Sequence, residues 1–80
     1  MARQYRITKP ITPEQGEEAI REIKERTNVK EVTLSDDLTT LTVFADDDQY
    51  YPVLSTALNI FRRIVSTSCE LIFSNFTYDD

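Results

Sequence analysis

The chain has 80 residues, one cysteine and no histidine, which is the size of one small domain without an internal disulfide. It is 40% hydrophobic and 29% charged, as in ordinary globular proteins, and its formal net charge is −5. Nucleic acids and anionic membranes are bound mainly through Lys and Arg, so this charge disfavours both as partners. No apolar run approaches the ~20 residues of a membrane span. No basic-then-apolar leader opens the chain, and a cytoplasmic location is therefore expected.

Four stretches alternate apolar and polar residues in the manner of half-buried strands. They span residues 3–11, 29–34, 39–45 and 69–76. The turn-forming sequence SDDL separates the second from the third, which predicts that these two strands form a hairpin.

The first helix is predicted from its capping residues. Thr12 is a suitable N-cap and Pro13 suits the first helical position. Gln15 follows Thr12 by three residues and can close a capping box. The helix should run to about residue 27, where Asn28 is the expected left-handed C-cap.

A second helix is predicted after the acidic sequence DDDQ, which suits a turn and a cap rather than a cation site. Pro52 is tolerable only in the first turn of a helix, so the helix should begin between Asp48 and Tyr51 and end near Thr67. Residues 77–80 are expected to be a frayed tail.

The order β-α-β-β-α-β predicts an α+β fold of the ferredoxin-like type over residues 1–80, as a single domain. In that sandwich, a four-stranded antiparallel sheet carries two helices on one face. The second and fourth strands should lie at the edges of the sheet.

Residues 10–16 (PITPEQG), followed by Ile20 and by Asn28-Val29, give the chain a resemblance to the heavy-metal-associated domain of metallochaperones and metal-pumping ATPases. The resemblance implies the same fold. The family's Cys-x-x-Cys thiolates fall at Pro13 and Gly16, which have no donor side chain, and soft metals need soft ligands. We therefore expect neither a metal nor another cofactor.

The second helix carries more apolar residues than a surface helix needs to reach its sheet. The excess predicts either an interaction surface or deep burial of the helix. The last strand contains one charged residue and few of the features that protect exposed strand edges. The predicted interaction surface, for a protein partner or a second copy of the chain, comprises Tyr50, Val53, Ile60, Glu70 and Ile72.

Four single residues receive structural interpretations. Gly16 is expected to pack against the last strand, and Phe61 and Phe73 are expected in the core. Cys69 is interpreted as a buried apolar residue, since no Lys, Arg or His adjoins it in the sequence to lower the pKa of its thiol.

No residue set forms a recognisable catalytic site, because the chain lacks histidine and a glycine-rich phosphate loop. The leading hypothesis is a non-catalytic interaction or regulatory domain that resembles heavy-metal-associated modules without their metal site. The resemblance implies a link to a metal-transport ATPase. The alternative is a small-molecule sensor of the ACT type, which uses the same topology as a dimer.

Overall fold

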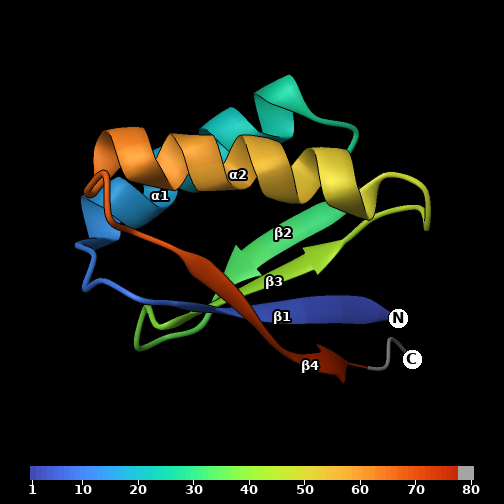
Figure 1. Cartoon of the computed structure of the whole chain (residues 1–80), viewed down its shortest axis with the longest axis horizontal. Coiled ribbons are helices and arrows are strands. Elements are labelled where there is room, and N and C mark those ends of the chain that lie inside the picture. The colour runs from blue at the N-terminus through green and yellow to red at the C-terminus, as the bar shows by residue number, and fades with distance from the viewer. Residues whose placement is uncertain (78–80) are drawn as a thin grey trace.

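The structure of the protein, a computed structural model, describes residues 1–77. Of the tail predicted at residues 77–80, Thr77 instead belongs to the last strand, and residues 78–80 lie outside the described range. Two helices and four strands follow one another in the predicted order (Figure 1): β1 (Ala2–Ile7), α1 (Pro13–Arg26), β2 (Glu31–Leu34), β3 (Thr40–Phe44), α2 (Tyr50–Ile64) and β4 (Leu71–Thr77).

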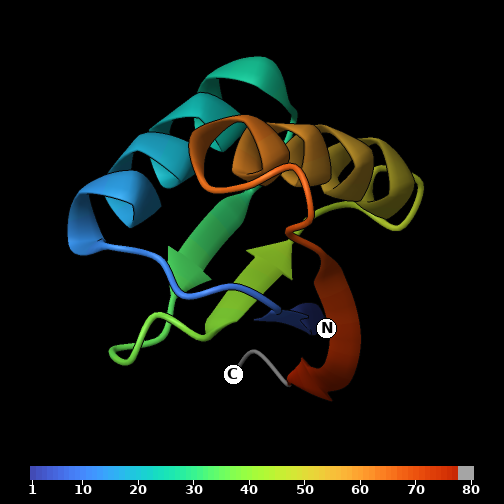
Figure 2. The ribbon, with the colours of Figure 1, turned by 60° about the vertical axis from the view of Figure 1, so that its left-hand side comes forward.

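The strands form one antiparallel sheet in the order β2-β3-β1-β4. Figure 2 shows both helices on one side of the sheet, with β4 at the outer edge. This arrangement confirms the ferredoxin-like prediction and the placement of β2 and β4 at the two edges. No helix formed by residues 1–77 has the length and apolar character needed to cross a membrane.

The capping box at the start of α1 is present as predicted. The Thr12 hydroxyl accepts a hydrogen bond from the backbone N–H of Gln15 at 3.1 Å, and the Gln15 side-chain oxygen accepts one from the N–H of Thr12 at 2.9 Å. At the other end the helix is capped by Thr27 in an extended conformation, whose hydroxyl donates to the carbonyl of Ile23 at 2.7 Å. The predicted left-handed cap at Asn28 is therefore wrong.

The β2–β3 turn is held by side-chain hydrogen bonds. The Ser35 hydroxyl accepts from the backbone N–H groups of Thr39 and Thr40, at 3.2 and 3.0 Å, and donates to the Asp37 carboxylate at 2.7 Å. Bonds from Ser35 and then Thr39 lower the pKa of Asp37 below its ordinary value of 3.8. Within this turn Leu38 has φ 62°, the one positive φ at a non-glycine position between residues 1 and 77.

Contacts between the two helices fix the layer above the sheet. The Glu22 carboxylate on α1 accepts a hydrogen bond from Arg63 on α2 and lies 3.8 Å from Arg26. The bond from Arg63 is the main cause that lowers the pKa of Glu22. The Gln15 amide also donates to the carbonyl of Ile64 at 3.3 Å, so the beginning of α1 is joined to the end of α2.

Gly16 packs against β2, not against the last strand as predicted. A Cβ atom at this position would lie 2.7 Å from Leu34 Cδ1, closer than real contacts allow. Ile11 and Leu38 stand around the same point at 3.6 and 3.8 Å. The only glycine of the chain therefore lets α1 approach the end of β2 closely.

The core lies between the helices and strands β1 to β3. Phe61 is fully buried there, as predicted. The predicted ends of several elements differ by a few residues from the observed ones. The last strand begins at Leu71 rather than at Cys69, because the N–H of Cys69 closes a turn on the carbonyl of Ser66 at 3.0 Å.

Candidate interaction site

Strand β4 presents apolar side chains to the surface. The exposed fractions of Ile72, Phe73 and Phe76 are 43, 47 and 44%, and no charged residue lies between Leu71 and Thr77. We call these three side chains the β4 patch. Ile72, which is paired with Arg6, points to the face of the sheet opposite the two phenylalanines, which are paired with Tyr5 and Arg3. The prediction that Phe73 lies in the core is wrong, because β4 runs at the edge of the sheet, where the helices do not cover it (Figure 2).

A β-bulge shapes the patch. Phe73 is paired with Tyr5 and Phe76 with Arg3, so positions three apart in β4 stand opposite positions two apart in β1. In a regular strand, side chains three residues apart point to opposite faces. The bulge at Ser74 brings both phenylalanines to one face, where their rings meet edge to face at a centroid distance of 4.9 Å. Alternation in the sequence gives no signal of this arrangement.

Arg3 connects the patch to the beginning of α2. Its guanidinium lies 4.1 Å from the centre of the Tyr50 ring and 5.7 Å from the centre of the Phe76 ring. The Tyr50 hydroxyl donates a hydrogen bond to the carbonyl of Met1 at 2.6 Å. These cation–π contacts hold Phe76 on the helix side of the sheet while leaving much of its ring exposed.

The α2 residues of the predicted interaction surface lie inside the protein. Tyr50, Val53 and Ile60 are each no more than 4% exposed. The alternative of a deeply buried helix therefore holds for these three side chains, and their prediction as an interaction surface is wrong. These three side chains pack in the hydrophobic core beneath α2 and are not accessible to a partner.

The other two predicted residues, Glu70 and Ile72, are exposed. Glu70 directly precedes β4, and its backbone N–H donates to the Thr8 hydroxyl at 2.9 Å while its carbonyl accepts from the Thr8 N–H at 3.1 Å. Ile72 is paired with Arg6. The part of the predicted surface that lies in and next to β4 is thus available to a partner.

Cys69 is fully buried, and burial raises the pKa of its thiol. A hydrogen bond with the backbone of Lys9 and the charges of Arg62 and Lys9 act in the opposite direction, but the effect of burial is larger. Arg62 also donates to the Cys69 carbonyl at 3.1 Å. The sequence could not place these cations, but the interpretation as an inert buried thiol agrees with the balance of the two effects.

The two positions that correspond to metal ligands in the heavy-metal-associated family lie at the first turn of α1. Pro13 is exposed, whereas Gly16 is buried against Leu34. Within residues 1–77 no three His, Cys, Asp or Glu side chains come together as a metal ion would require.

Among the described residues, the exposed apolar edge strand β4 is therefore the candidate surface for binding a partner. Comparisons of the chain with protein-family models, with curated proteins and with solved structures found no match.

Proposed function

We propose that this chain is a non-catalytic interaction domain that associates with a second copy of itself through β4. The observation that carries the proposal is the β4 patch: three large apolar side chains stand exposed on an uncharged edge strand, which in the described sheet is paired on one side only, with β1. Monomeric proteins usually protect such edges with lysine, proline or a covering loop.

A second copy fits this edge because an antiparallel pair of identical strands is self-complementary about a two-fold axis. Each copy would supply backbone groups to the other, and its patch would meet the partner's patch. Removal of apolar surface from water contributes roughly 25 cal/mol per Å². The bulge at Ser74 restricts regular pairing to short segments on either side of it, so side-chain burial must supply much of the affinity.

Sedimentation velocity over a range of concentrations up to several hundred micromolar tests the proposal. We expect reversible dimers of the wild type and a monomer for Phe76→Lys, which places a charge in the patch. The matched control is Thr33→Lys, which adds the same charge to the exposed edge strand β2 and should leave the dimer intact. A wild-type chain that stays monomeric throughout, or a Thr33→Lys variant that dissociates equally, would overturn the proposal.

The resemblance to heavy-metal-associated domains extends the proposal to a setting beside a metal-transport ATPase, in which the domain acts without binding metal. Support comes from the missing donor side chains at Pro13 and Gly16. The ACT-like alternative differs in one measurable respect. It calls for a dimer that forms only when a small molecule is added, whereas the β4 dimer needs none.

A further inference from the structure

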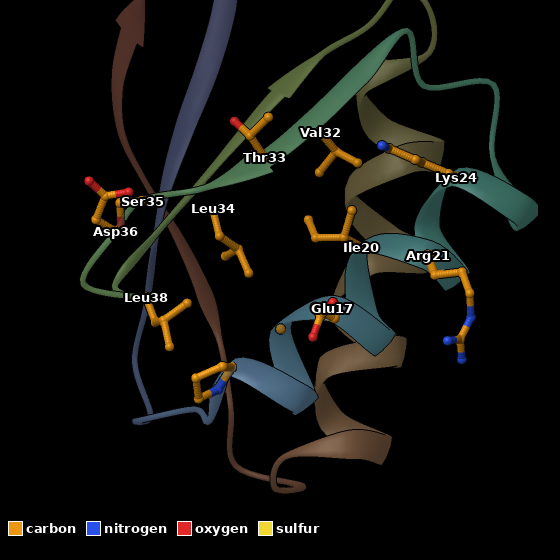
Figure 3. A pocket seen from close by; sticks show the side chains of 12 residues that line it. Glu17, Ile20, Arg21, Lys24, Val32, Thr33, Leu34, Ser35, Asp36 and Leu38 are labelled. Atoms are coloured by element: carbon orange, nitrogen blue, oxygen red, sulfur yellow. The ribbon is translucent and has the colours of Figure 1, made fainter.

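A groove of about 760 Å³ runs between α1 and β2, at the opposite edge of the sheet from β4 (Figure 3). One wall is a stripe of α1 that includes Gly16, Ile20, Arg21 and Lys24. The other wall is formed by residues 32–34 of β2 and by residues 35, 36 and 38 of the turn that follows. From Pro13 to Lys24 the helical wall is about 16 Å long at 1.5 Å per residue. This length accommodates about five extended residues.

The strand that borders the groove has an unpaired backbone edge. Among residues 1–77, β2 is paired only with β3, and the N–H of Ser35 donates to the carbonyl of Thr40 at 2.9 Å. Hydrogen-bonded and non-hydrogen-bonded pairs alternate along an antiparallel ladder. The backbone groups of Val32 and Leu34 therefore point away from β3, toward a strand that would lie along the edge.

The floor of the groove is apolar. Ile20, Leu34 and Leu38 are half-buried and contribute their side chains from α1, β2 and the β2–β3 turn (Figure 3). Leu38 has a positive φ of 62°, which is an unfavourable backbone conformation for leucine. Its Cδ2 atom would lie 3.8 Å from a Cβ atom at Gly16, so its side chain reaches the surface of α1. These three residues can receive the alternate side chains of an extended peptide.

The charges of the groove are separated along its length. Lys24 points toward Val32, at the beginning of β2, whereas the Arg21 side chain points away from β2 (Figure 3). Neither cation forms a salt bridge within residues 1–77. Glu17 and Asp36 lie farther along, toward the end of β2. This separation follows from the antiparallel course of α1 and β2, and it gives the groove one cationic end.

We propose that this groove binds an extended peptide segment of another protein, which adds to β2 as a further antiparallel strand. Its alternate apolar side chains occupy the floor, and an aspartate or glutamate at its C-terminal end lies beside Lys24. An antiparallel strand has its C-terminal end at the beginning of β2, where Lys24 stands. The whole sheet is antiparallel, and antiparallel pairs are the more stable kind. An edge strand beside a side-chain groove is a general means of peptide recognition, in which the backbone supplies affinity and the pockets supply specificity.

A displayed library of random seven-residue peptides, selected on the whole chain, tests the proposal. We expect enrichment of sequences with apolar residues at alternate positions and an acidic residue at the C-terminal side. The double variant Arg21→Glu with Lys24→Glu should bind the enriched peptides about fivefold or more weakly, since the ion pair with Lys24 and the nearby positive charge of Arg21 are replaced by repulsion. Arg6→Glu with Lys9→Glu makes the same change of charge outside the groove and should keep wild-type affinity.

Methylated peptides test the strand pairing itself. N-methylation of the enriched peptide at the amides that face β2 should weaken binding about tenfold or more, because each lost N–H breaks a ladder hydrogen bond. Methylation of the alternate amides, which face solvent, should change the affinity little. Absence of enrichment, equal binding to both double variants, or equal effects of the two methylation patterns would each overturn the proposal. The Phe76→Lys variant should still bind the peptide, so peptide binding by the groove can be tested independently of the β4 dimer.

Discussion

Gly16 shows at the scale of a single residue how α1 is fitted to the sheet. The helix comes so near to β2 that a methyl group at this position would meet Leu34 Cδ1 at 2.7 Å. Glycine is unfavourable within a helix by about 1 kcal/mol relative to alanine. Glycine at position 16 therefore lowers the intrinsic stability of α1, and the close packing of α1 against Leu34 offsets this loss.

The first prediction separates these two effects by a double-mutant cycle. Gly16→Ala should leave the free energy of unfolding nearly unchanged, because the helix gains stability while the end of the Leu34 side chain must move. In the Leu34→Ala background the same substitution should stabilise by about 1 kcal/mol, since the obstructing atom is gone. Urea denaturation of the four proteins measures both values. Equal effects in the two backgrounds would show that Leu34 does not set the spacing.

Thr12 is the second residue with a defined energetic role. Thr12→Ala should destabilise the protein by about 1 kcal/mol in chemical denaturation, because the N–H of Gln15 loses its acceptor. Thr12→Ser keeps a hydroxyl at the same place and should retain most of the stability. If the two variants lose the same amount, the hydrogen bond is not the cause.

At the scale of elements, the order of helices and strands could be predicted because each carries a local signal: alternation in the strands, the capping box of α1 and the position of Pro52 near the beginning of α2. The surface of β4 could not be predicted in the same way. Its exposure depends on how far the helices extend over the sheet, and the common face of Phe73 and Phe76 depends on a bulge opposite β1. The groove could not be predicted because it depends on how α1 packs along the edge of β2, which no local pattern in the sequence specifies.

The β2–β3 turn leads to a prediction about acid stability. The folded pKa of Asp37 is lowered, so its stabilising contribution is complete above the ordinary value of 3.8 and is lost as the pH falls through the lower folded value. Asp37→Asn keeps an oxygen acceptor but removes the charge. We expect the variant to be less stable than the wild type at neutral pH, and the difference to shrink as the pH falls below about 4. Denaturation at a series of pH values measures this change.

The control for the turn is Asp36→Asn, which leaves the hydrogen bonds of Asp37 in place. At neutral pH it should destabilise the protein less than Asp37→Asn does, because it breaks none of the bonds to Ser35 and Thr39. A constant difference between Asp37→Asn and the wild type would contradict the assignment of this turn as an acid-sensitive element.

At the scale of the whole molecule, the net charge of −5 acts differently on the two proposed surfaces. Two copies that meet through uncharged β4 strands repel one another through the rest of their surfaces, and salt screens this repulsion. The dissociation constant of the dimer should therefore fall as salt rises. The affinity of the groove for an acidic peptide should fall in high salt, since its attraction to Arg21 and Lys24 is screened as well. Sedimentation and fluorescence anisotropy at low and high salt measure the two affinities. We expect the affinity of the dimer to rise with salt and that of the peptide complex to fall, and a change in the same direction for both would contradict one of the assignments.

The position of β4 also has a consequence for how the chain reaches its native state. Within the described sheet β4 is paired with β1 alone. The β1–β4 ladder therefore joins residues 2–7 to residues 71–77 and cannot form until residues 71–77 have been synthesised. Closing such a long loop is entropically costly, and the exposed strand regains little apolar burial in return. During synthesis the inner strand β1 therefore remains open on one side until the last strand has left the ribosome. In the finished protein, hydrogen exchange should find the β1–β4 ladder opening more readily than the β1–β3 ladder beneath the helices.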